Sequence, residues 1–190
     1  MAGYVIHLVV ASEYLRKTKE IINDKDAFIK GVIFPDTVKD KGRTHYSEKY
    51  SSDTNLYDFV EDNIDNLSED FYKGFFLHLL TDFLFYKKHY KLPPGGIATQ
   101  TIHDDYDKIN KYVLEKYPID IPEEVIEFCR QKDGEPVYVK KEKLDSFVDE
   151  ASGYNLQELA EEILKRKDFY AVLNTDRMDS SERECEGRWI

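Results

Sequence analysis

Apolar residues recur at helical spacing along most of the chain, and this pattern predicts a mostly or wholly α-helical protein. The expected helices cover residues 4–22, 26–34, 53–66, 68–91, 100–117, 122–130, 141–151 and 155–167. Pro35 and the run Pro93-Pro94-Gly95-Gly96 are expected to end two of them, because the residue before a proline disfavours the α conformation. The polar residues 36–52 are expected to form a loop, and residues 137–139 a short extended piece.

The longest apolar run, residues 74–86, contains a histidine and an aspartate four positions apart, His78 and Asp82. On a helix such side chains share one face about 5–6 Å apart, so both can reach one metal ion. Aspartate is rarely buried unpaired among Phe and Leu, and a cation would offset the cost of burying it. In a regular helix His89 would continue the same face.

Further potential ligands occur in the neighbouring segments. His103 and Asp107 repeat the four-residue spacing on the next predicted helix. Asp36 and His45 fall in the predicted loop, where irregular backbone can turn side chains toward a site, and His7 faces inward from the first helix. Histidine nitrogen and aspartate oxygen ligands suit zinc, manganese or iron. The residue set therefore indicates a metal-dependent hydrolase.

Several of these residues also have a purely structural explanation. A lone histidine on an apolar helix face, such as His7, is usually a core residue, and His89 lies near a helix end where the dipole favours a basic side chain. The acidic run 104–107 is typical of a solvated first helical turn. Taken alone, the pattern therefore favours His78 and Asp82 and leaves the others open.

Composition narrows the class of protein. A net charge of −11 provides no basic stripe for duplex nucleic acid, although bound divalent ions would reverse the charge locally. Cys129 and Cys185 form no CxxC motif and suggest reduced thiols, and the N-terminus lacks the features of a signal peptide. The apolar run 74–86 is too short to span a bilayer. We expect a single cytoplasmic domain over residues 1–174 and a polar tail over 175–190, whereas the oligomeric state is not indicated.

Four motifs follow one another in a recognisable order. They are a histidine in the N-terminal helix, Gly31-Val32-Ile33-Phe34-Pro35-Asp36, Thr44-His45-Tyr46, and Gly74-Phe75-Phe76-Leu77-His78-Leu79-Leu80-Thr81-Asp82. This order resembles the zinc-dependent phospholipase C family, whose superfamily includes single-strand-specific zinc nucleases. The resemblance covers roughly residues 4–117 and leaves a helical extension at about 119–174 unmatched.

The resemblance implies an all-α, single-domain, phospholipase C-like bundle of several helices that hydrolyses phosphoesters with two or three zinc ions. The implied ligands are Asp36, His45, His78 and Asp82 for a first site, His89, His103 and Asp107 for a second, and His7 for an ion toward which Asp82 bridges. Asp36 or Asp104 would accept a proton from a metal-bound water. The implied substrate is a small-molecule or lipid-like phosphoester.

Two other functions stay open at the level of the sequence. An HD-type nucleotide phosphohydrolase would use the literal dipeptide His103-Asp104 together with the upstream candidate ligands. A non-catalytic helical module would hold a structural metal or none. Asp82 has apolar neighbours whereas Asp104 lies in an acidic run, and this difference favours the phospholipase C-like interpretation.

Overall fold

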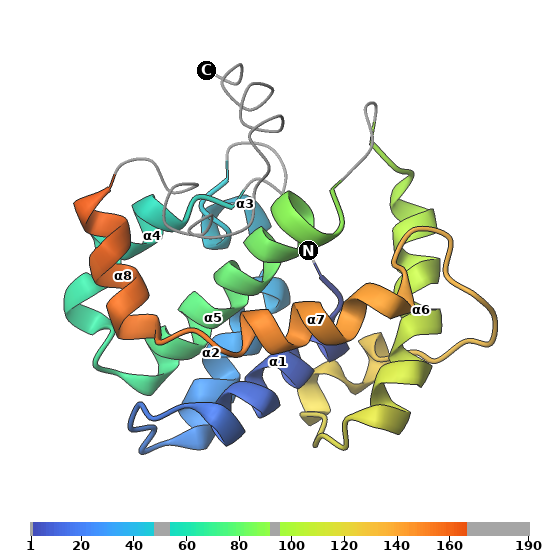
Figure 1. Cartoon of the computed structure of the whole chain (residues 1–190), viewed down its shortest axis with the longest axis horizontal. Coiled ribbons are helices and arrows are strands. Elements are labelled where there is room, and N and C mark those ends of the chain that lie inside the picture. Colours follow the sequence, from blue (N-terminus) through green and yellow to red (C-terminus); the bar gives the residue numbers. More distant parts are fainter. Residues whose placement is uncertain (1, 48–53, 92–95, 167–190) are drawn as a thin grey trace.

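The computed structural model describes residues 2–47, 54–91 and 96–166, and in these ranges it contains helices and no strand (Figure 1). The α-helices are α1 (Tyr4–Lys17), α2 (Lys25–Thr37), α3 (Lys41–Thr44), α4 (Leu56–Asn63), α5 (Asp70–Leu84), α6 (Thr99–Lys116), α7 (Lys141–Ala151) and α8 (Leu156–Lys165). Two 3₁₀ segments, η2 (Ile64–Asn66) and η4 (Glu123–Phe128), and a π-helical turn, η3 (Phe85–His89), complete the described elements. The all-α prediction is confirmed.

Some element boundaries differ from the sequence expectations. The first helix ends at Lys17, the predicted loop contains the short helix α3, the segment after Pro122 is 3₁₀ rather than α-helical, and residues 137–139 form bends. The tail 175–190, with Cys185, and the expected break at residues 93–95 lie outside the described residues. No helix in the described ranges has the length and apolar character needed to cross a membrane.

Helix α5 is the centre of the structure, and α1, α2, α4, α7 and α8 all pack against it (Figure 1). Every residue from Gly74 to Leu84 is buried, which is typical of a helix that is apolar on all sides. Helix α2 makes the most extensive of these contacts. A polar side chain on this stretch of α5 must therefore find its partners inside the protein.

Two glycines allow α2 and α5 to cross with their backbones in direct contact. A Cβ atom added to Gly31 would lie 2.0 Å from the carbonyl oxygen of Phe71, and one added to Gly74 would lie 2.0 Å from that of Phe28. Any side chain at either position would hold the helices apart. The crossing brings the C-terminal turns of α2 beside the segment of α5 that carries His78.

Helix α2 continues through Pro35 to Thr37, so the prediction that it ends at Phe34 was wrong. Side-chain hydroxyls, those of Tyr4 and Thr44 from outside α2 among them, satisfy the carbonyl groups of its last turn. These hydrogen bonds run from Thr37 Oγ1 to Phe34 O (2.9 Å), from Thr44 Oγ1 to Pro35 O (2.9 Å) and from the Tyr4 hydroxyl to Asp36 O (2.7 Å). These tertiary contacts outweigh the local preference of the residue before proline. Asp36 consequently lies on a helix and not in a loop.

The central helix also departs from a regular α-helix near its end. After Leu84 it widens into the π-helical turn η3, in which the Tyr90 N–H donates to Phe85 O at 2.7 Å. A π-turn closes its hydrogen bond over five residues instead of four, so the residues within it fall out of register with the preceding helix face. His89 therefore leaves the face that carries His78 and Asp82.

We expect Gly31→Ala or Gly74→Ala to lower the free energy of unfolding by at least about 3 kcal/mol, because the clash is with backbone that cannot move aside. The gain in helix propensity, about 1 kcal/mol, is smaller. Urea denaturation measures the difference. Gly42→Ala is the control, because its added Cβ would lie 3.3 Å from its nearest neighbour, Ser47 O. Wild-type stability in both interface variants would contradict the close crossing.

Candidate metal centre

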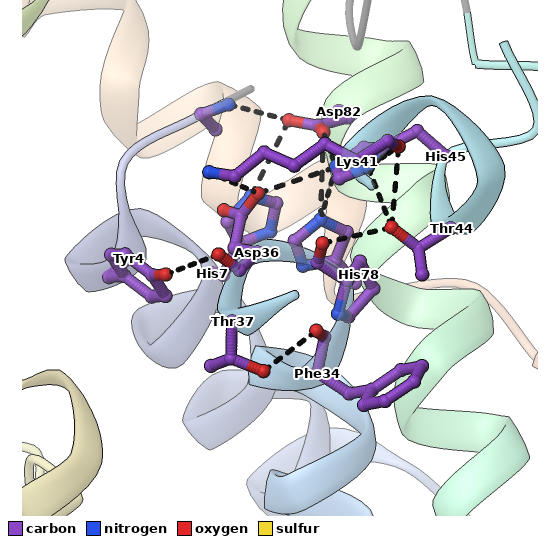
Figure 2. Close-up of polar contacts among 12 residues, drawn as sticks. Tyr4, His7, Phe34, Asp36, Thr37, Lys41, Thr44, His45, His78 and Asp82 are labelled. Atoms are coloured by element: carbon purple, nitrogen blue, oxygen red, sulfur yellow. Dashed lines mark hydrogen bonds and ion pairs between the residues drawn. The ribbon is translucent and has the colours of Figure 1, made fainter. Parts of the chain in front are cut away.

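Five side chains far apart in the sequence converge at one buried point (Figure 2). They are His7 from α1, Asp36 from α2, His45 just after α3, and His78 and Asp82 from α5. None of the five residues is more than 4% exposed. The cluster therefore concentrates three imidazoles and two carboxylates in the interior of the helical bundle.

Backbone carbonyls fix how two of the imidazoles are protonated. His78 Nδ1 lies 2.7 Å from Val32 O, and His45 Nδ1 lies 2.8 Å from Lys41 O. Because a carbonyl oxygen only accepts, each Nδ1 carries the hydrogen and each Nε2 presents a lone pair. The two Nε2 atoms face each other at 3.1 Å. Two lone pairs at this distance require a cation between them, either a metal ion or a proton.

The distances around these nitrogens match the edges of a zinc tetrahedron. His45 Nε2 lies 3.4 Å from Asp36 Oδ1 and 3.3 Å from Asp82 Oδ2, and His78 Nε2 lies 3.6 Å from Asp82 Oδ2. Ligands bonded to tetrahedral zinc at about 2.0–2.1 Å are separated by about 3.3 Å. His45, His78 and Asp82 therefore have the atom types and the spacing of zinc ligands, and Asp36 adjoins them through His45.

Asp82 connects this ligand set to His7. Its Oδ2 faces His45 and His78, while its Oδ1 accepts a hydrogen bond from the Ala2 N–H at 2.5 Å and lies 3.4 Å from His7 Nε2. The His7 ring stacks on the His78 ring with centroids 3.8 Å apart. The potential ligands form two overlapping groups, each with ligand atoms within 4.8 Å of one another: His7, Asp36 and His78; and His45, His78 and Asp82.

The cluster leaves several buried polar atoms without a hydrogen bond. They are both ring nitrogens of His7, both carboxylate oxygens of Asp36 and Oδ2 of Asp82. Each such atom costs about 1–3 kcal/mol, and more if it is charged. Asp36 also lies in the last turn of α2, where the helix dipole opposes a negative charge. A bound divalent cation would offset all of these costs, so the residues present fit a zinc ion.

The acid–base properties of the cluster reflect burial and mutual charge. Burial opposes ionisation of Asp36 and Asp82. The surrounding histidines outweigh it at Asp36, and nearby positive charge, to which His7 and His45 contribute, outweighs it at Asp82, so the pKa of both carboxyls lies below its usual range. Burial lowers the pKa of His78 to about 4, and the charge of His7 adds to this effect. Burial also disfavours a charged His45, but the carboxylates of Asp36 and Asp82, 3.4 and 3.3 Å from its Nε2, raise its pKa to about 9. Without a metal, the proton between the lone pairs therefore resides on His45.

The structure does not place His89 in this cluster. Its Nε2 lies 2.8 Å from Glu150 Oε2 on α7, and its ring packs edge-on against Phe147. The π-helical turn is the physical reason, because it breaks the register on which the expected alignment with His78 depended. Among the described residues, His89, His103 and Asp107 do not come close enough to one another to form a group of three potential metal ligands.

Asp104, expected as a proton acceptor, lies in the first half of α6 and outside the cluster. It pairs with Lys108 and with Lys132. Its partly exposed carboxylate is therefore already neutralised by two lysines. His103 and Asp107, from the same helix, line a cavity that Asp36 also lines. The first expected ligand set is thus assembled in one place together with His7, whereas the second is dispersed.

This cavity has a volume of about 560 Å³ and adjoins the cluster at Asp36. Its wall includes two cations, Lys41 and Arg130, and the aromatic side chains of Tyr4, Tyr106 and Phe128. None of these was a candidate from the sequence, because none belongs to a motif with a characteristic spacing. Only the packing of α1, α3, α6 and the segment after η4 brings them to Asp36.

The chain matches the model of the zinc-dependent phospholipase C family over residues 4–154 and belongs to that family. The match extends beyond residue 117, where the recognisable motifs end, and includes α7. No curated protein and no solved structure matches the chain. The family membership and the buried cluster of histidine and aspartate together indicate a metal-dependent hydrolase and are compatible with zinc.

The raised pKa of His45 predicts how the metal-free protein responds to pH. A pKa of about 9 in the fold, against an ordinary value of 6.5, provides stability that is complete below pH 6.5 and lost as the pH rises through about 9. In the presence of a chelator, the urea midpoint should therefore fall over this range. With saturating zinc it should rise with pH, because the ligands must be deprotonated to bind. Parallel profiles in the two conditions would contradict this assignment.

Proposed function

We propose that the protein hydrolyses phosphoesters with zinc held by Asp36, His45, His78 and Asp82. The observation that carries this proposal is the pair of Nε2 lone pairs 3.1 Å apart, surrounded by two buried carboxylates at tetrahedral spacing. A purely structural core would need a proton on His45 between these nitrogens and would still leave the carboxylate oxygens of Asp36 and the ring nitrogens of His7 without hydrogen bonds. Membership of the zinc-dependent phospholipase C family supports the same chemistry.

Zinc bound at these ligands would polarise a phosphoryl oxygen and make water a nucleophile at neutral pH. The protein's own residues prepare the site for this. Val32 O and Lys41 O hold His78 and His45 in the tautomer whose Nε2 is free to ligate. Asp36 belongs to the cluster and is also a lining residue of the cavity, although its carboxylate is fully buried. Where zinc leaves one of its oxygens free, this carboxylate would accept the proton of a water molecule.

The arrangement favours a principal zinc ion at these residues, on which water would take a further coordination position, and a second position on the side of His7 and Asp82 Oδ1. A site made of His89, His103 and Asp107 is not part of this proposal, because His89 points to Glu150. A proton on His45 in place of zinc is the alternative that corresponds to a non-catalytic module.

The HD-type alternative is disfavoured by the position of Asp104. In such a site the aspartate of the His-Asp dipeptide would be a metal ligand, but Asp104 forms ion pairs with Lys108 and Lys132 on the surface of α6. The buried aspartate that contacts two histidines is Asp82. This distribution of partners agrees with the phospholipase C-like interpretation.

His78→Ala and Asp82→Asn should each remove bound zinc and abolish hydrolysis of a panel of phosphoesters. Asp82→Asn keeps the size of the side chain and removes the charge that a cation requires. Zinc content after native purification, measured by elemental analysis, and hydrolysis rates are the two readouts. His89→Gln is the matched control, because His89 lies outside the cluster and should be dispensable for both.

Wild-type zinc content in either cluster variant would refute the proposed ligand set. Loss of zinc in the His89→Gln protein would instead support a metal site made of His89, His103 and Asp107. Purified wild-type protein that contains no zinc, manganese or iron, and takes up none, would favour the non-catalytic module.

A further inference from the structure

We infer that Lys41 and Arg130 form an anion-binding subsite that holds the phosphoryl group of the substrate beside the metal cluster. The inference rests on the proposed function and extends it from a metal site to a substrate site. It concerns two basic side chains in a chain whose net charge is −11, both of which line a cavity that Asp36 also lines.

Lys41 connects the cavity to the cluster in two ways. Its backbone carbonyl accepts a hydrogen bond from His45 Nδ1 at 2.8 Å, while its ammonium group lies 3.7 Å from Asp36 Oδ1. Figure 2 shows the side chain extended across the cluster toward Asp36. The side chain is 38% exposed, so its charge also faces the cavity. A ligand that approaches Asp36 therefore meets this ammonium group.

Arg130 is held near the same point by a chain of contacts. The Tyr4 hydroxyl donates to Asp36 O at 2.7 Å, and the Tyr4 ring stacks on Phe128 with centroids 5.4 Å apart. Two residues later, Arg130 O accepts a hydrogen bond from the Asn110 side chain at 2.8 Å. These contacts fix the backbone on both sides of residue 129 against α1 and α6. The exposed Arg130 side chain is thereby placed at the cavity wall.

Lysine and arginine together suit a phosphate group. Arginine presents a planar fork of donors to two phosphate oxygens, and lysine adds a compact charge. Asp107 and Glu127 also line the cavity, so its wall is not uniformly basic. The position of Lys41 next to Asp36 directs the anion toward the cluster, where a phosphoryl oxygen would meet the metal ligands.

The aromatic part of the cavity wall indicates the class of substrate. Tyr4, Tyr106 and Phe128 offer apolar and aromatic surface beside the two cations. A phosphoester fits this combination when its phosphoryl group carries full negative charge and its alcohol portion is compact enough for a cavity of about 560 Å³. We infer a small phosphoester anion that enters head first, with the phosphoryl group toward Asp36.

Inorganic phosphate is the probe, and isothermal titration calorimetry of the zinc-loaded full-length protein is the assay. Lys41→Met and Arg130→Met should each weaken phosphate binding on the order of tenfold, the effect of losing one charge-assisted hydrogen bond. Lys41→Met keeps the backbone carbonyl that orients His45, so its zinc content should equal that of the wild type. Lys39→Met and Arg43→Met are controls that remove the same charges from exposed neighbours outside the cavity wall.

Unchanged phosphate affinity in both cavity variants would overturn the inference. Loss of zinc in Lys41→Met would also overturn it, because Lys41 would then act by supporting Asp36. Equal weakening in the two control variants would show only a general effect of charge. The titration also applies if the wild type takes up no zinc. Phosphate binding that still depends on Lys41 and Arg130 would then preserve the subsite while the proposed zinc chemistry fails, and no phosphate binding at all would overturn both.

Discussion

The direct contact between the backbones of α2 and α5 is the constraint on which the rest of the structure depends. Gly31 and Gly74 remove the side chains that would separate the helices, and each added Cβ would lie 2.0 Å from a carbonyl oxygen of the other helix. The crossing allows His78 to reach Val32 O and sets its Nε2 toward His45, in the same ligand group as Asp36. A wider separation would break this hydrogen bond and pull the carboxylate of α2 away from the histidine of α5. The close packing of α2 against α5 therefore also sets the positions of the candidate metal ligands.

The cluster also shows why a site for a cation can lie in an apolar helix. Its members are acceptors that face one another, and several have no hydrogen bond among the described residues. Such an arrangement destabilises the metal-free fold, and a proton on His45 offsets only part of that cost. Binding of a divalent cation would offset this cost and raise the free energy of unfolding, so metal uptake is coupled to the folded state. The surrounding contacts, from Ala2, Val32 and Lys41, orient the ligands before any ion arrives.

Helical register explains which parts of the site could be anticipated. The pair His78 and Asp82 could be predicted from the sequence because a regular helix places residues i and i+4 on one face. The fold keeps that stretch of α5 regular. The same rule failed for His89, since the π-helical turn lies between it and the pair. Likewise, the local rule that ends helices before proline misplaced Asp36. Tertiary hydrogen bonds from Tyr4 and Thr44 hold the last turn of α2 together beyond Pro35.

Periodicity, composition and the order of motifs thus determined by themselves the all-α class and the family, and they singled out His78 and Asp82 as the central candidate ligands. These properties depend on spacing along one helix or on residue types, both of which a single chain displays directly. The family resemblance already named Asp36, His45 and His7 as ligands, but only the tertiary structure brought them together with that pair, turned His89 to Glu150, and placed Lys41 and Arg130 in the wall of the cavity beside Asp36. Those facts depend on how closely helices cross and where a helix changes its turn. Distant contacts set both, and no local pattern encodes them.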